Sequence, residues 1–139
     1  MYKFPIGVII DGFKTDRHTA IDLAARLKVD GIQMFATKGI NAPENMDLSA
    51  RKALKKEVAD AGLIFSALCG DMGMGFGDRE RNPVLIAKLK KILDLANDLG
   101  TNIVHRQVLL NFTKPLPQIL PVRQFTTLLR MLLTIMLTR

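Results

Sequence analysis

Hydrophobic residues recur along the first 104 positions in two alternating patterns, and each pattern predicts a different element. Short apolar runs predict buried strands, at residues 6–10, 32–35, 63–68 and from 102 onward. Apolar residues three or four positions apart predict helices with one apolar face between those strands. The three faces are formed by Ala20, Leu23, Ala24 and Leu27, by Ala50, Leu54, Val58 and Ala61, and by Leu85, Leu89, Ile92, Ala96 and Leu99.

Residues that cap helices stand before each helical segment. An Asp, Ser, Thr or Asn at this position can accept a hydrogen bond from a free backbone N–H of the first turn. Proline is favoured at the first helical position, because it has no N–H to satisfy. The expected caps are Thr15 or Asp16 for the first helix, Asp47 or Ser49 for the second, and Asn82 before Pro83 for the third.

Three glycines, Gly31, Gly62 and Gly100, each stand between an expected helix end and the next strand. Their spacing of 31 and 38 residues is typical of βα units. Strands joined by helices run parallel, and strands this uniformly apolar are expected to be covered on both faces. The sequence therefore predicts an α/β fold, either a doubly wound sheet or part of a (β/α)₈ barrel.

The pattern changes after Val104. Three prolines fall within seven residues, at 115, 117 and 121, and exclude a regular helix there. Residues 122–137 predict one helix, with apolar residues all around its axis. We expect an N-terminal half-barrel over residues 1–105 and an atypical basic tail over 106–139, whose lack of any Asp or Glu favours out-of-frame or otherwise foreign sequence.

The net charge of +7 comes mostly from this tail, because residues 1–105 hold 15 Lys and Arg against 13 Asp and Glu. The five cations of the tail are scattered among leucines, which argues against a nucleic-acid-binding stripe. The apolar runs 5–10 and 125–137 are too short to span a membrane. A lone cysteine, Cys69, excludes an intrachain disulfide and suits a reducing compartment. We therefore expect a cytoplasmic protein without nucleic-acid or membrane partners.

In parallel α/β folds, functional side chains gather at the carboxyl ends of the strands. The candidates for substrate binding are Asp11, Gln33, Asp71 and His105. Plain alternatives remain open: Asp11 before Gly12 can shape a turn, and Gln33 can be a polar layer residue inside a barrel. Lys38 and Cys69 also lie near strand ends, and Cys69 is expected to be a small buried hydrophobe.

The loop Gly70–Gly77 is rich in glycine and methionine and lies between a strand and a helix. It predicts either a phosphate cradle or a loop that closes over a site, and it matches neither standard nucleotide-binding motif. His18 falls in the first turn of a helix, where it is expected to be solvated, which leaves His105 as the one histidine at a strand end. One histidine does not make a metal site, so no metal ligand is assigned in this chain.

Five segments together resemble the opening half of a sugar phosphate isomerase/epimerase of the xylose isomerase-like TIM barrels. The resemblance lies in the order of the strand and helix segments and covers about residues 3–104. The segments are Ile6–Asp11, Ala20–Ala25, Asp30–Phe35, Leu63–Leu68 and Ala96–Val104.

The resemblance implies a barrel in which Mn²⁺ or Mg²⁺, held by carboxylates and a histidine of later strands, polarises a sugar carbonyl while paired carboxylates move a proton. A whole barrel needs about 250 residues, and the sequence pattern predicts only four strands in this chain. We therefore expect an isomerase/epimerase-like protein that binds a sugar or sugar phosphate, holds no cofactor of its own and is inactive as this truncated chain. The alternative is a non-catalytic half-barrel that acts by homo-oligomeric assembly.

Overall fold

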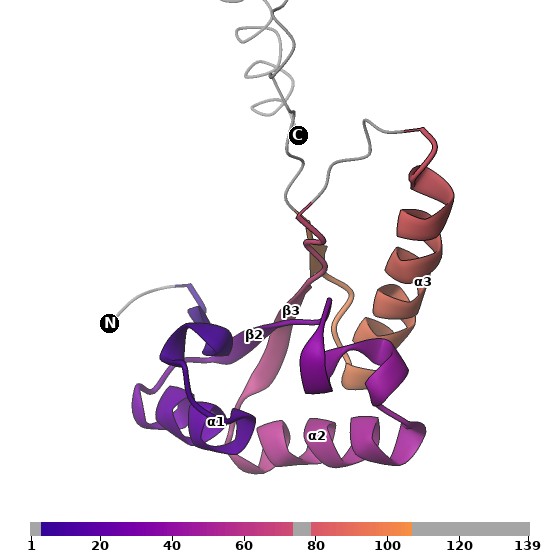
Figure 1. The fold of residues 1–139 in the computed structure, drawn as a ribbon. Helices are drawn as coiled ribbons and strands as arrows, with labels where there is room; N and C mark the ends of the chain where they lie inside the picture. Colours follow the sequence, from indigo (N-terminus) through magenta and orange to yellow (C-terminus); the bar gives the residue numbers. More distant parts are fainter. Residues whose placement is uncertain (1–3, 74–78, 107–139) are drawn as a thin grey trace, which may run out of the picture. The chain divides into compact units, whose positions relative to one another are not determined.

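The computed structural model describes residues 4–73 and 79–106, which belong to one unit of the chain, Met1–Leu109. The predicted tail helix and the centre of the glycine-rich loop lie outside the described residues. Strands and helices alternate in the described part (Figure 1), and short 3₁₀ turns follow β1 and β2. The elements are β1 (Gly7–Ile9), η1 (Ile10–Phe13), α1 (Arg17–Arg26), β2 (Gly31–Phe35), η2 (Gly39–Asn41), η3 (Pro43–Asn45), α2 (Leu48–Asp60), β3 (Ile64–Cys69), α3 (Asn82–Leu99) and β4 (Val104–His105).

The four strands form one parallel sheet in the order β1-β2-β3-β4, which is also their order in the chain. A doubly wound sheet reverses its strand order at a switch point, and the described strands do not. Because βα crossovers are right-handed, an unbroken order places every connecting helix on the same face of the sheet. The structure therefore confirms the α/β fold with four parallel strands and selects the barrel type of architecture.

The hydrophobic core lies between this sheet and its helices. Ile32, Met34 and Leu68 point from β2 and β3 toward the helices and have no exposed surface. They pack with fully or almost fully buried residues of α1, α2 and α3. The predicted face of the first helix is partly wrong, because Leu27 lies beyond the end of α1 and is 59% exposed, whereas Ile21, which was not predicted, is buried. The core residues from the helices are Ala20, Ile21, Ala24, Leu54, Val58, Ile92, Leu95, Ala96 and Leu99.

The other face of the sheet corrects the prediction that the strands are covered on both sides. Alternate residues of a strand point to opposite faces, and those that point away from the helices include Ile9, which is 47% exposed, and Ile64, which is 63% exposed. We call this surface the open face. A uniformly apolar strand does not by itself distinguish a doubly covered sheet from one wall of a barrel, since both surfaces of a barrel wall are apolar.

Aspartates cap the first two helices, as predicted. Asp16 Oδ1 accepts the N–H of Thr19 at 3.0 Å, and Asp47 Oδ1 accepts the N–H of Ala50 at 2.7 Å. The cap predicted for the third helix is wrong, because Asn82 is the first helical residue. The cap position belongs to Arg81, whose side chain makes no capping bond.

The glycines differ in what they do. Gly62 and Gly100 adopt left-handed backbone angles at the ends of α2 and α3, with φ of 76° and 87°. Gly31 does not end the first helix, because Lys28 takes the left-handed conformation there and Gly31 begins β2. A Cβ at Gly31 would lie 2.9 Å from the Ile64 carbonyl oxygen, so close strand packing requires glycine at this position.

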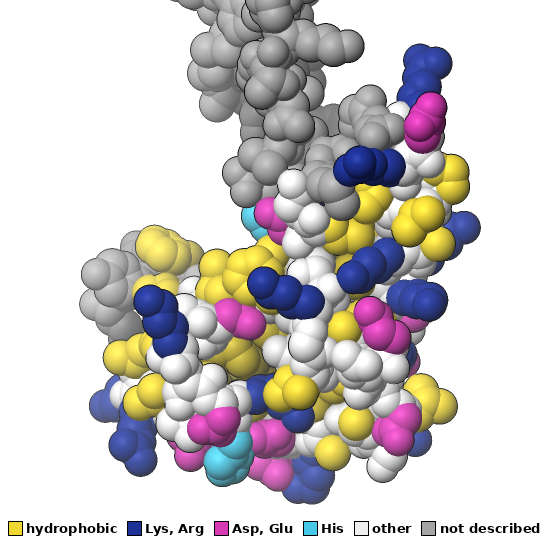
Figure 2. Space-filling view, viewed as in Figure 1, with side chains coloured by type: hydrophobic (Ala, Val, Ile, Leu, Met, Phe, Trp, Pro, Cys, Tyr) yellow, Lys and Arg dark blue, Asp and Glu magenta, His cyan; other side chains and the backbone are white. Residues whose placement is uncertain are grey.

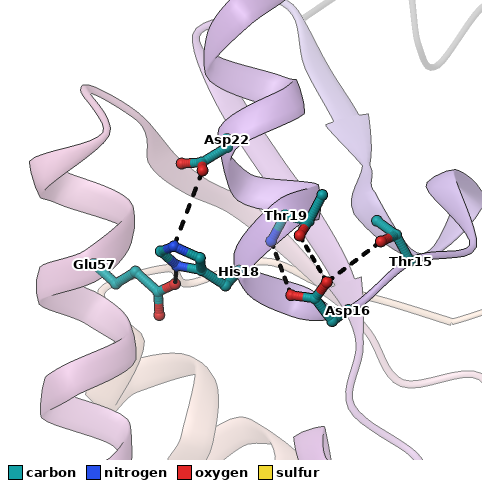
Figure 3. Close-up of polar contacts among 6 residues, drawn as sticks. All are labelled: Thr15, Asp16, His18, Thr19, Asp22 and Glu57. Carbon is teal, nitrogen blue, oxygen red and sulfur yellow. Dashed lines mark hydrogen bonds and ion pairs between the residues drawn. The ribbon is translucent and has the colours of Figure 1, made fainter.

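Polar contacts between described residues join α1 to α2 and α2 to α3. His18 Nδ1 of α1 lies 2.7 Å from Glu57 Oε1 of α2 (Figure 3), although the imidazole is exposed as predicted. Arg51 of α2 donates from Nη1 to Asp98 Oδ2 of α3 at 2.7 Å. Within residues 4–73 and 79–106, no helix combines the length and the apolar character that crossing a bilayer requires.

Candidate functional site

The register of the sheet places two rows of side chains across the open face. Ile9 is aligned with Gln33, and Gln33 with Ala67. One step nearer the carboxyl ends, the second row consists of Phe35, Cys69 and His105. Since residues two apart on a strand share a face, both rows lie on the same surface. The structure thus brings two predicted site residues, Gln33 and His105, to one face of three neighbouring strands.

A bulge in β3 makes this alignment possible. The partners of Ile32 and Gln33 are Phe65 and Ala67, so Ser66 is an additional residue without a partner on β2. Its hydroxyl donates to the Ile32 carbonyl oxygen at 2.9 Å. One extra residue reverses the facing of every residue after it. The bulge therefore turns Leu68 toward the core and leaves Ala67 and Cys69, the residues on either side of it, on the open face.

Asp11 lies at the carboxyl end of β1, where its side chain is tied to the neighbouring strand. Its Oδ2 accepts the N–H of Phe35 at 2.9 Å, and the residue itself is exposed within η1. Asp11 therefore joins the ends of β1 and β2. This contact is closer to a structural role, such as the predicted shaping of a turn, than to the predicted substrate contact. The bond also places a carboxylate beside the Gln33 and Phe35 column.

Asp71 follows β3 and shapes the start of the glycine-rich loop. Its Oδ1 accepts the N–H of Gly73 at 2.9 Å, and Gly73 has a left-handed φ of 70°. The side chain is half-buried. Residues 74–78 lie outside the described part of the chain, so the two roles predicted for the loop stay predictions.

Lys88 is a residue near this edge that sequence reasoning missed. Its Nζ donates to the Thr37 carbonyl oxygen at 2.7 Å. The charged end of this α3 side chain therefore lies against the segment that follows β2. Lys88 stands between Leu85 and Leu89, at the border of the apolar stripe, where a lysine ordinarily belongs to the solvated side of a helix. No spacing in the sequence distinguishes it from its neighbours, because the contact depends on how α3 packs.

The two histidines and the cysteine have different surroundings. Cys69 is 4% exposed, which confirms it as a small buried hydrophobe. His105 is exposed at the end of β4, on the open face. His18 lies on α1, where the hydrogen bond with Glu57 and then the charge of Asp22 raise its pKa (Figure 3). Its contacts are those of a link between helices, so His105 remains the histidine of the candidate site.

The described residues do not fit a catalytic divalent metal. Residues 4–73 and 79–106 contain no cluster of three or more His, Cys, Asp or Glu side chains able to hold an ion. Of the two carboxylates at strand ends, Asp11 accepts a bond from β2 and Asp71 accepts one from its own loop. Two open hollows, of about 540 and 310 Å³, lie beside the start of α2 and include none of the candidate site residues.

Comparisons with known proteins identify the fold. No family model matches the chain, and no curated protein sequence matches it. Among solved structures, it is similar to a xylose isomerase domain protein from Planctomyces limnophilus, with a TM-score of 0.60 and 20% sequence identity. The match covers 82% of this chain and 46% of that chain, so this chain spans about half of the length of the protein it matches. The fold is therefore xylose isomerase-like, as the sequence resemblance implies.

Proposed function

We propose that this chain binds a sugar or a sugar phosphate at the carboxyl-terminal edge of its sheet and does not turn it over alone. The observation that carries the proposal is that Gln33, Phe35 and His105 share the open face of an isomerase-like sheet, in two adjacent rows near its carboxyl ends. We place this binding in the cytoplasm, where the thiol of Cys69 stays reduced.

The chemistry of the aligned side chains suits a sugar. The Gln33 amide both donates and accepts hydrogen bonds, as a sugar hydroxyl does, and its side chain is half-buried, so its position is restricted. The His105 imidazole adds a second donor or acceptor on the same face, two strands away on β4. Phe35 follows Gln33 on the same face of β2 and offers a flat apolar surface for the C–H face of a sugar ring. Asp11 and Asp71 border the same edge.

Turnover requires more than binding. Isomerisation or epimerisation removes a weakly acidic proton next to a carbonyl, so the resulting anion must be stabilised and a base must lie within hydrogen-bond reach. Related chemistry uses a divalent metal for the first task. Because the described residues assemble no three-ligand set, we propose that this half supplies contacts to the substrate, and that metal ligands and the proton-transfer pair belong elsewhere in a complete barrel.

Calorimetric titration with D-fructose and D-fructose 6-phosphate tests the proposal. We expect Gln33→Ala and His105→Ala each to weaken binding about tenfold, the effect of one hydrogen bond worth about 1.4 kcal/mol. His18→Ala is the matched control, since it removes the other histidine, and it should leave the affinity unchanged. Equal affinities for the His105 and His18 variants would contradict the binding site. Turnover of either sugar that depends on added Mn²⁺ or Mg²⁺ would contradict the proposal that this chain alone is inactive.

A further inference from the structure

The two edges of the described sheet carry backbone groups that point away from their neighbours. Gly31 N donates to the Ile6 carbonyl oxygen at 3.2 Å, so residues 6 and 8 of this segment face β2. In a parallel pair the bonding residues alternate along the strand. The N–H and C=O groups of Gly7 and Ile9 therefore point outward from β1.

The same reasoning applies to β4 at the opposite edge. Leu68 N donates to the Ile103 carbonyl oxygen at 2.9 Å, and Gly70 N donates to that of His105 at 2.8 Å. Residues 103 and 105 thus face β3, and the N–H and C=O of Val104 point outward. Each edge also bears a half-exposed isoleucine, since Ile9 is 47% exposed and Ile103 is 55% exposed.

We propose that a second copy of this chain covers both edges, with β4 of each copy pairing in parallel with β1 of the other. A two-fold axis along the direction of the strands keeps all eight strands parallel and continues the order β1-β2-β3-β4 around a closed ring. Eight parallel strands are what a barrel of this type contains. One copy matches 46% of a protein with this fold, so two copies provide about one whole barrel.

Closure of the ring sets where the two copies meet. Parallel pairing of β4 with β1 brings their carboxyl ends together at both of the two equivalent contacts. The ring also encloses the open face, which buries Ile9 and Ile103 and gathers the Gln33 and His105 side chains of two copies around one opening.

Sedimentation velocity of the full chain over a range of concentrations measures the assembly. We expect a reversible change from a species of 15.5 kDa to one of twice that mass. Ile9→Pro removes one outward N–H and a contact residue, and the φ of Ile9, −83°, is close to the value that proline requires. Because both symmetric contacts are affected, the dimer dissociation constant should rise on the order of 100-fold. Leu48→Pro is the control, since the first position of a helix accepts proline.

Amide hydrogen exchange on the unmodified chain keeps the proposal falsifiable even where Ile9→Pro does not fold. The amides of Ile9 and Val104 should become protected as concentration rises, whereas that of Val8, which faces β2, should be protected throughout. A monomer at all concentrations would overturn the proposal. So would a dimer that survives Ile9→Pro, or edge amides protected independently of concentration, which would mean that another segment covers them.

Discussion

Replacing Arg51 by methionine should cost about 3 kcal/mol of the free energy of unfolding. Its guanidinium donates to Asp98 Oδ2 at 2.7 Å, to the Met46 carbonyl oxygen at 2.9 Å and to the Pro43 carbonyl oxygen at 3.0 Å. These bonds join α2, α3 and the segment between β2 and α2. Loss of a bond to a charged group costs about 1.5–3 kcal/mol. The sum is reduced because the Asp98 side chain is 34% exposed and rehydrates, while Arg51 is only 16% exposed.

Urea unfolding followed by circular dichroism measures this loss. With a slope of about 2 kcal/mol per molar, 3 kcal/mol lowers the midpoint by about 1.5 M. Arg51→Lys keeps the charge without the planar fork and should recover only part of the stability. The control is Lys56→Met, which removes an exposed ion pair with Asp60 and should cost less than about 0.5 kcal/mol. A loss below about 1 kcal/mol in Arg51→Met would refute the view that this arginine holds the helices together.

Three further predictions concern the caps, the sheet and pH. Asp47→Ala should lower the free energy of unfolding by about 1 kcal/mol by removing the bond to Ala50 N, whereas Ser49→Ala should not; equal effects in urea unfolding would contradict the assigned cap. Gly31→Ala should cost about 2 kcal/mol because the added Cβ meets Ile64, and Gly12→Ala, with nothing within 4 Å, is its control in the same assay. Glu57 and Asp22 raise the pKa of His18, so protonated His18 stabilises the folded chain below its unfolded pKa of about 6.5, and this contribution is lost as pH rises through the raised value. The stability difference between wild type and His18→Gln should therefore be larger at pH 5.5 than at pH 8.5, and a difference that is the same at both would argue against the Glu57 link.

The alternation of strands and helices was predictable because it follows from local pattern. Apolar spacing identifies α1, α2 and α3, and Asp16 and Asp47 identify two helix starts. The cap of α3 was not predictable, because Asn82 and Pro83 are compatible with a helix start at either of two positions. Tertiary packing determines which of the two is adopted. Gly31 shows the same limit, because a glycine after a helix signals a left-handed turn and a close strand contact equally well.

The candidate site was predictable at the level of which strand ends carry polar residues. Its geometry was not, because the shared face of Gln33 and His105 depends on the unpaired Ser66 in β3, and nothing in the spacing of an apolar strand marks a bulge. The tie between Asp11 and Phe35 N, and the reach of Lys88 to Thr37, join residues 24 and 51 positions apart. Such contacts follow from the packed fold, so a single sequence did not predict them.

The position of a bound sugar tests the central claim most directly. Amide chemical shifts of the full chain, recorded during titration with D-fructose 6-phosphate, report which end of the sheet meets the ligand. We predict that the largest changes occur at Gln33, Asp71 and His105, at the carboxyl ends of the strands. Changes concentrated instead around Gly31, Gly62 and Gly100, at the opposite rim, would contradict the account.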